Sequence, residues 1–551
     1  MAAPVPTVVR GALLIDGRGG DPQELDLRIG TDGRVADVAA AITPFEGDEV
    51  VDGSGRVLCP GFIDMHSHSD LYTLVRPANG AAPIGDGPKL LQGCTAQVFG
   101  QDGISAAPVG EHDVEGYASY IAGLDGFLEP AQWTWRSFAR YLSALRAASS
   151  TRVAGLVGHS TVRRLVMGMD NRPPTADELQ AMQAVVAQAM DEGAIGLSTG
   201  LVYVPAAYAD TAELIALCEV VAAKGGRFFV HVRSESDRVV EATEEVIGVA
   251  DQTGVHLHYS HIKAAGRANW PLGERLVAMV SGAIDAGVTI TSDVHPYTAG
   301  STTAQVLLPP WVLEGGRDAA LQRLGDPAAR ARARRQLLSD TTSWDNWWAF
   351  SDGWDGLRVA GLPPGVRPEL VGRSFADVLE EAGIADPHSP EAFDVAFDLL
   401  VEAGLAVSIV SFNNTEENVA RFLAQPHCTV GSDALVNPGG HPHPRLYGTF
   451  PRVLGHFVRE LGALDLPTAV TAMTGRAAAA LGQASLGTIS VGGAADLVLF
   501  DPSAIADRAT YEDPRLPPTG VSRVWVGGRP VVVSGALTGD APPAEVPSPG
   551  E

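Results

Sequence analysis

The sequence predicts an α/β protein built on a (β/α)8 barrel of the TIM type, with a small β domain formed by both ends of the chain. Two patterns in the 551 residues predict this architecture. In the middle, short apolar runs alternate with stretches of helical period, as in βα units around a parallel sheet. At both ends, apolar and polar residues alternate with a period of two, as in half-buried strands.

Eight apolar runs supply the predicted barrel strands. Each ends in polar residues, near positions 66–68, 99–102, 157–159, 197–199, 229–231, 259–261, 290–293 and 430–433. Helical segments lie between them, for example at 175–191 and 210–224. An open doubly wound sheet is the alternative, but no Gly-x-Gly-x-x-Gly turn follows a strand. A further apolar run, 407–412, is expected to be an extra strand before the last one.

The two chain ends predict the small β domain. Strand-like runs separated by Asp-Gly turns occupy residues 8–38, and similar runs lie at 495–500 and 521–526. The expected division is 1–58 with 480–540 for this domain and 59–479 for the barrel, with an insertion at about 313–405. The arginine run 330–335 in the insertion is expected to be a solvated helix face, and the segment from Asp540 a loose end.

Composition excludes several classes of function. The net charge of −26 disfavours binding to nucleic acid or to an anionic membrane surface. No apolar run approaches the ~20 residues of a membrane span, and the first residues lack the pattern of a signal peptide. The four cysteines are scattered, which argues against a disulfide framework. We therefore expect a reduced, cytoplasmic protein.

The first predicted barrel strand ends in a histidine pair. His66 and His68 follow the apolar Phe62-Ile63, and residues two apart in a strand point the same way. They are candidates for half of a metal site. Taken alone, His-x-His is a weak signal, and two solvated loop histidines are the simpler interpretation.

Other strand ends supply the rest of a candidate metal site. Asp102, His231 and His261 follow the second, fifth and sixth runs, and Asp433 follows the last. In a barrel, such ends meet at one rim. Histidine and carboxylate ligands suit zinc, and also manganese or iron, and the metal would activate water for hydrolysis. Asp433 is the expected proton-transferring residue, with a helix N-cap as its simpler alternative.

Cys94 and three further histidines also carry ligand-type atoms, but none of them is assigned to the metal site. Cys94 begins the second strand, ~20 Å from its end, so a small buried residue is expected there. His256 and His258 lie an odd number of residues before His261, which places them on the other side of the strand. His159 also ends a strand but has no expected role.

Candidate substrate anchors lie near the same rim. Lys263, Arg445, Tyr203 and Ser301 all follow predicted strands. Two cations and a phenol suggest a substrate that carries a carboxylate, although each cation is equally well explained by a surface ion pair. Arg233 and Glu235, beside His231, are expected to support one another.

Together these motifs resemble the N-acyl-D-amino-acid deacylases of the amidohydrolase superfamily. The resemblance runs through nearly the whole chain and rests on the segments 60–68, 158–159, 196–203, 231–235, 260–263, 431–433 and 444–450. It implies a metal-dependent barrel with a flanking β-sandwich, one or two zinc ions, an aspartate acid/base that fits Asp433, and hydrolysis of an N-acyl bond on a D-amino acid.

Two positions depart from the family pattern. The family's Gly-Asn-Cys-Gly corresponds to Gly100-Gln101-Asp102-Gly103, so a carboxylate replaces a thiolate ligand. Its Tyr-Pro-Tyr corresponds to His295-Pro296-Tyr297, which puts His295 near the substrate. No lysine ends the fourth strand, so a carbamylated lysine is not expected there.

Three functions compete at this point. The first is a deacylase of N-acyl-D-amino acids. The second is a related hydrolase, either a dipeptidase for peptides with a C-terminal D-residue or a cyclic-amide hydrolase, the latter disfavoured by Lys263 and Arg445. The third is a non-catalytic scaffold, which would be expected to lose ligands that this chain retains. The oligomeric state is not predicted.

Overall fold

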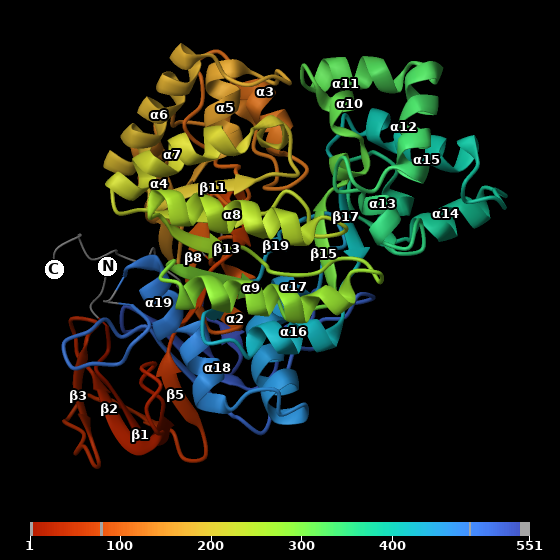
Figure 1. Cartoon of the computed structure of the whole chain (residues 1–551). Helices are drawn as coiled ribbons and strands as arrows, with labels where there is room; N and C mark the ends of the chain where they lie inside the picture. The colour runs from red at the N-terminus through yellow and green to blue at the C-terminus, as the bar shows by residue number, and fades with distance from the viewer. Residues whose placement is uncertain (1–3, 78–80, 484–485, 540–551) are drawn as a thin grey trace.

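The computed structural model describes residues 4–77, 81–483 and 486–539. A closed barrel of parallel strands forms its centre (Figure 1). Backbone hydrogen bonds join the two barrel sheets: for example, Leu156 N donates to Phe99 O over 2.9 Å, and Met65 N donates to Val430 O over 3.3 Å. The barrel strands are, in order, β6 (Phe62–Asp64), β8 (Cys94–Phe99), β9 with β10 (Arg152–Gly155, Val157–Gly158), β11 (Gly196–Gly200), β12 (Arg227–His231), β13 (His256–Tyr259), β14 (Ile290–Val294) and β18 (Cys428–Val430). The eight predicted strands are confirmed.

Helices surround the barrel because each has one apolar face and defined ends. Thr175 caps α6 and forms a capping box with Glu178, and Asp210 caps α7 by accepting from Glu213 N. Both helices match the predicted segments. The helices around the barrel are α1 (Asp70–Thr73), α2 (Gly87–Leu91), α3 (Val114–Ile121), α4 (Phe138–Ala148), α5 (His159–Met167), α6 (Ala176–Asp191), α7 (Thr211–Ala223), α8 (Val239–Thr253), α9 (Gly273–Asp285), α16 (Glu416–Leu423), α17 (Arg445–Arg452), α18 (Leu466–Met473) and α19 (Gly475–Leu481).

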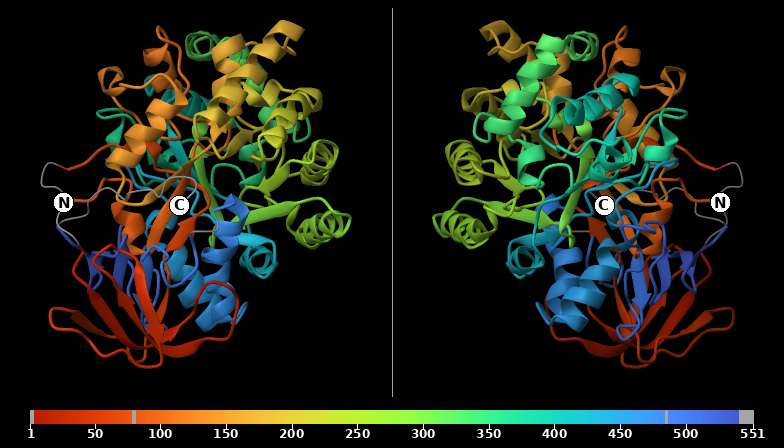
Figure 2. Two further views of the ribbon diagram at one scale, coloured as in Figure 1. Left: turned by 90° about the vertical axis from the view of Figure 1, so that its left-hand side faces the viewer. Right: turned by 90° about the vertical axis from the view of Figure 1, so that its right-hand side faces the viewer.

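A nine-stranded sheet combines both ends of the chain. Figure 2 shows the red N-terminal strands beside the blue C-terminal ones, below the barrel. One edge of β1 pairs with β2, and the other pairs with β4 and then β5, which lets the sheet fold around an apolar core that includes Trp525. The strands are β1 (Thr7–Leu14), β2 (Gln23–Ile29), β3 (Val35–Ala39), β4 (Glu49–Asp52), β5 (Val57–Pro60), β20 (Leu497–Phe500), β21 (Val521–Val526), β22 (Arg529–Val533) and β23 (Ala536–Leu537).

A long excursion separates β14 from β18 and forms the green and teal lobe in Figure 1. The run at 407–412 is confirmed as a strand, but it lies outside the barrel, at the centre of a small antiparallel sheet. Ser301, which follows the seventh predicted barrel strand, lies in another strand of that sheet. The elements are β15 (Ala299–Thr303), β16 (Leu357–Gly361), β17 (Ser408–Phe412), α10 (Pro310–Leu313), α11 (Arg317–Leu324), α12 (Pro327–Ser339), α13 (Trp347–Phe350), α14 (Phe375–Glu381) and α15 (Pro390–Glu402).

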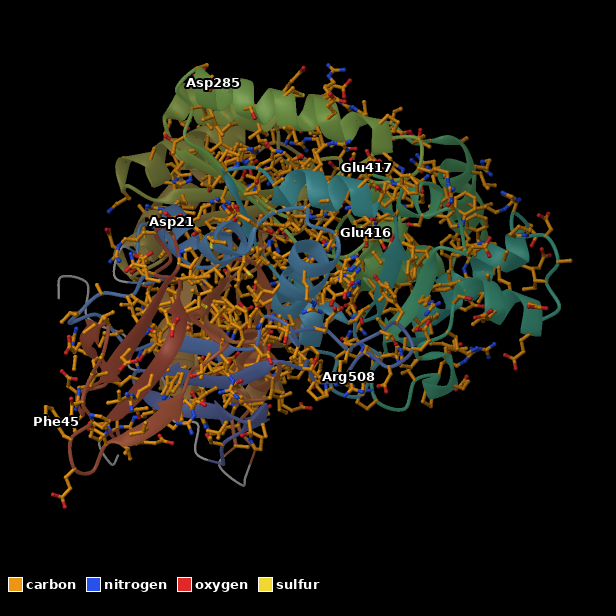
Figure 3. All side chains as sticks on the ribbon, turned by 90° about the horizontal axis from the view of Figure 1, so that it is seen from below. Asp21, Phe45, Asp285, Glu416, Glu417 and Arg508 are labelled. Carbon is orange, nitrogen blue, oxygen red and sulfur yellow. The ribbon has the colours of Figure 1, made fainter. Side chains whose placement is uncertain are left out.

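The outer surface carries few large apolar side chains. Figure 3 places Phe45 at the far end of the sheet domain from the barrel, where it is 70% exposed. Glu416 and Glu417 begin α16 on the barrel side. Among the residues that the structure places, no helix combines the length and the apolar character needed to cross a bilayer.

Candidate metal and active site

The predicted histidine pair lies buried at the carboxyl end of the barrel. His66 follows β6, and His68 ends the short strand β7 (Ser67–His68), which pairs with β19 (Ala434–Leu435) directly after Asp433. The two Nε2 atoms face each other at 3.3 Å. Asp433 N donates to His66 O over 2.7 Å, so this pairing fixes Asp433 beside the histidines.

A second group of ligand-type atoms adjoins the first. His231 ends β12, His261 follows β13, and His231 Nδ1 lies 3.1 Å from His261 Nε2. Asp102, after β8, belongs to both groups: its Oδ1 is 3.5 Å from His66 Nε2 and 3.5 Å from His261 Nε2. The structure therefore brings together all five predicted ligands and Asp433.

The backbone at this rim is unusual. Asp102, His261 and Asp433 adopt φ values of 54°, 34° and 52°, in the left-handed region that side-chain-bearing residues seldom occupy. The extended strand conformation is lost at these points, and the three side chains belong to the buried cluster of ligand-type atoms. Such strain persists only where surrounding contacts impose it, and it concentrates at functional sites.

The distances within the cluster suit a metal better than direct hydrogen bonding. Zinc–nitrogen bonds of about 2.1 Å in a tetrahedral site place neighbouring ligand atoms about 3.4 Å apart. The contacts from His66 Nε2 to His68 Nε2 and to Asp102 Oδ1, and from His68 Nε2 to Asp433 Oδ1, are 3.3, 3.5 and 3.4 Å. Asp102 Oδ1 is buried without a hydrogen-bond partner. The residues present therefore fit one or two divalent cations that share Asp102.

Charges around the cluster favour its ionised carboxylates. Burial opposes the ionisation of Asp433, but the adjacent Arg445 guanidinium, with His68 and His66, holds the pKa of Asp433 well below its usual value. Arg445 Nη1 donates to Asp433 Oδ2 over 2.8 Å. Burial lowers the pKa of His231 to about 4, which favours the neutral form that binds metals.

Two aspartates that the sequence analysis missed orient the histidines from outside the cluster. Asp125, in the segment after α3, lies 2.9 Å from His68 Nδ1. Asp293, at the end of the seventh barrel strand, accepts from His261 N over 3.0 Å and lies 2.8 Å from His258 Nε2. The Asp125 carboxylate is placed to fix the ring orientation of the ligand candidate His68. Asp293 instead holds the backbone of His261, and its Oδ2 lies 3.8 Å from His66 Nδ1. The position of Asp293 at a strand end was a usable signal, whereas nothing in the pattern around Asp125 indicated its role.

Glu235 has a different partner from the one expected. Its Oε1 accepts from Lys263 Nζ over 2.5 Å and lies 2.9 Å from His261 Nδ1. Arg233 instead pairs with Glu245 on α8, with donor–acceptor distances of 3.0 Å. The expectation that Arg233 and Glu235 support one another is wrong. Strand β12 ends at His231, so the two side chains beyond it no longer share one face and contact different partners.

Asp345, from the insertion, braces the loop that carries Glu235. It is buried, accepts from Glu235 N over 3.0 Å and from Ser234 Oγ over 2.8 Å, and also bonds the hydroxyl of Ser236. Asp345 thus connects the insertion to the loop whose Glu235 contacts His261. No sequence pattern marked this residue.

The predicted substrate-binding residues lie around Asp433 with unused hydrogen-bonding groups. Both ring nitrogens of His295, the hydroxyl of Ser301 and Nε of Arg445 are buried without a partner. Arg445 also donates to Ser301 O over 2.8 Å, and Tyr203 bonds Thr302 through its hydroxyl over 2.7 Å. Lys263 lies against Glu235 and His261. Unpaired buried polar groups are costly, so a polar ligand is the natural partner for these atoms.

The remaining candidates lie apart from the cluster. Cys94 is buried at the start of β8, as expected. His159 hydrogen-bonds Thr199 and Glu213 at 2.9 and 2.7 Å, a role in packing. His258 is buried: its ring packs against Phe229, and its Nε2 lies 2.8 Å from Asp293 Oδ2.

Comparison with known proteins gives a consistent result. The model of the amidohydrolase family matches residues 49–532. D-aminoacylase of Alcaligenes xylosoxydans xylosoxydans is 35% identical and covers 97% of this chain and 96% of its own length. N-acyl-D-aspartate deacylase of the same organism is 34% identical, with 99% and 95% covered. The crystal structure of N-acyl-D-glutamate deacylase from Bordetella bronchiseptica, complexed with zinc and a phosphonate mimic of the tetrahedral intermediate, has a TM-score of 0.81 at 32% identity and covers 98% of this chain and 99% of its own. This chain belongs to the amidohydrolase family.

Proposed function

We propose that this protein is a metal-dependent hydrolase that cleaves the amide bond of N-acyl-D-amino acids into a carboxylate and a free D-amino acid. The observation that supports it most directly is the cluster in which Asp433 Oδ1 lies 3.4 Å from His68 Nε2, beside four further metal-ligand side chains. Relatives that deacylate such substrates share a third of its sequence over nearly the whole chain.

The metal centre is assigned to His66, His68, Asp102, His231 and His261, with zinc as the expected ion. When bound, the metal activates water and polarises the scissile carbonyl. Asp102 adds negative charge shared between the two groups of ligands, and the buried neutral His231 supplies a free lone pair. Manganese and iron would accept the same donors.

Asp433 acts as the proton carrier. Its carboxylate is ionised because Arg445 lies beside it, so Oδ1 can accept a proton from the attacking water. It then gives this proton to the amide nitrogen as the C–N bond breaks and the new C–O bond remains in the product acid. The reaction needs no other proton donor.

Arg445, Lys263, His295, Ser301 and Tyr203 are assigned to substrate binding. Arg445 retains an unpaired Nε–H, and His295 and Ser301 retain unpaired buried atoms close to it. The Lys263 ammonium has three N–H groups and two partners among the described residues. These donors suit the carboxylate of an open amide. A cytoplasmic location is proposed because all four cysteines are buried and unpaired.

The test is hydrolysis by zinc-loaded protein of matched N-acetyl-D- and N-acetyl-L-amino acids and of dipeptides with a C-terminal D-residue. We expect release of the free amino acid from the D-amides, lost when the metal is chelated and restored when zinc is added back. Cleavage of the dipeptides alone would make the protein a dipeptidase. Metal-loaded protein that cleaves nothing in this panel would overturn the proposal in favour of a scaffold.

A further inference from the structure

A cavity of about 150 Å3 lies between the barrel rim and the insertion. Its walls come from the segment after β8, from α3, from the segment after β11, and from the insertion. Most of its lining is apolar, including Ile104, Leu124, Val204, Leu313, Trp344 and Trp347. A space of about 150 Å3 with apolar walls is large enough to hold a benzene ring.

The cavity adjoins the metal site through shared residues. Tyr203 lines it, and the ring of Tyr203 lies 5.3 Å from the ring of His231. Ile104 also lines it and comes two residues after Asp102. A substrate whose amide lies at the metal site therefore reaches the cavity with a group of only a few carbon atoms.

The charged groups of the lining, Arg233 and Asp345, already have hydrogen-bond partners within the protein. Arg233 makes two hydrogen bonds to Glu245 and donates to Ala209 O over 2.9 Å. The Asp345 carboxylate accepts three hydrogen bonds from the loop at 234–236. No unpaired cation is left among the described lining residues to receive a second substrate carboxylate. The indole Nε1 of Trp347, in contrast, is buried without a partner.

We propose that this cavity binds an apolar group of the substrate, so that the preferred substrates are N-acyl-D-amino acids bearing a phenyl- or leucyl-sized apolar substituent, and that D-aspartate and D-glutamate derivatives are poor substrates. This inference rests on the proposed function. Relatives of this chain differ in the amino acid of their substrate, since one acts on an aspartate derivative and another on a glutamate derivative. The apolar group is either the amino-acid side chain or the acyl chain, which share one chemistry.

A substrate panel separates these two sources. N-acetyl-D-alanine is the reference, N-acetyl-D-leucine and N-acetyl-D-phenylalanine enlarge the side chain, and N-hexanoyl-D-alanine enlarges the acyl group. We expect at least one series to exceed the reference in kcat/KM by about tenfold or more, and N-acetyl-D-aspartate and N-acetyl-D-glutamate to fall below it. Equal rates for small and large apolar groups, or a preference for the acidic substrates, would overturn the inference.

A filling variant ties the preference to the cavity. Ala207 lines it, so Ala207→Phe should reduce the ratio of kcat/KM for the large apolar substrate over N-acetyl-D-alanine by about tenfold. Ala212→Phe, at an exposed position on α7, is the matched control and should leave the ratio unchanged. An unchanged ratio in a folded, metal-loaded Ala207→Phe variant would also overturn the inference.

Binding measurements keep the cavity testable if no amide is cleaved. Failure of zinc-loaded protein on the whole panel would reject the proposed function. Calorimetry with N-acetyl-D-phenylalanine and N-acetyl-D-aspartate then tests the cavity alone: tighter binding of the apolar ligand, weakened in Ala207→Phe, supports it, and no difference between the two ligands rejects it.

Discussion

Asp433 combines three features that a proton carrier needs. It faces His66 and His68, its φ of 52° holds it at the rim, and Arg445 keeps it ionised. Asp433→Asn should therefore lower kcat by about 10²–10⁴-fold, because the amide cannot accept the proton. Metal content, measured by atomic emission, should stay close to that of the native protein, since the histidines remain.

A surface aspartate provides the control for this variant. Among the described residues, the hydrogen bonds to the Asp340 carboxylate come from its own turn, from Thr342 N and from Ser343. Asp340→Asn should keep both kcat and metal content. Full turnover in Asp433→Asn would remove the assigned role.

Asp102 belongs to both groups of metal-ligand candidates, so its replacement should weaken metal binding by both groups. Removing a residue that hydrogen-bonds to a metal ligand typically lowers metal affinity by about 10–100-fold. Because Asp102→Ala removes a ligand itself, it should weaken zinc binding by at least about 100-fold, measured by competition with a chromogenic chelator. Cys94→Ala is the control, because Cys94 is buried at the opposite end of β8. Unchanged stoichiometry in Asp102→Ala would show that the carboxylate is not a ligand.

Site residues at the end of a barrel strand could be predicted from the sequence. Residues that reach the site from a distant segment could not. His66, His231 and Asp433 could be found because a strand directs each to the same rim. Asp125 reaches His68 from a segment 57 positions away, and no local period encodes that contact. The same limitation explains why Asp345 was missed.

At the scale of elements, the loop after β12 links the insertion to the metal site. Asp345 accepts from Ser234, Glu235 and Ser236, and Glu235 in turn contacts His261 and Lys263. Asp345→Asn should leave buried donors unpaired and lower the free energy of unfolding by about 1–3 kcal/mol, measured by urea denaturation. Zinc affinity should fall with it, because His261 loses its orientation.

The outcome distinguishes positioning from simple stabilisation. Asp340→Asn, five residues earlier in the insertion, should change neither quantity. If Asp345→Asn lowered stability but left zinc affinity and KM unchanged, the contact would be only a structural anchor of the insertion.

Element prediction succeeded where one local rule applied and failed where the chain changed direction. The helical period located α6 from the sequence. The run at 407–412 was found as a strand, but its partners β15 and β16 lie about 50 to 110 residues away, so apolar pattern alone did not reveal an antiparallel sheet. The division of the chain into domains stays a prediction.

At the scale of the whole molecule, the closed barrel explains why so many titratable groups are buried. Its eight strand ends converge, and the surrounding helices exclude water from histidines outside the metal site as well. His427, next to β18, is one such residue: burial, with Arg476 nearby, lowers its pKa to about 4. Its Nδ1 lies 3.2 Å from Ser292 Oγ, and its Nε2 is buried without a partner.

This buried histidine predicts a loss of stability in mild acid. A histidine whose folded pKa is about 4, against about 6.5 unfolded, binds fewer protons in the folded state between these values. The folded state therefore loses stability as pH falls from about 6.5 to about 4, by up to ~3 kcal/mol from His427. His427→Gln should reduce the slope of unfolding free energy against pH in that window, measured by urea denaturation at several pH values. His112→Gln, at an exposed position, is the control and should leave this slope unchanged. An equal slope in His427→Gln and the native protein would show that His427 does not contribute, leaving His256, whose pKa burial also lowers to about 4, as the next group to replace.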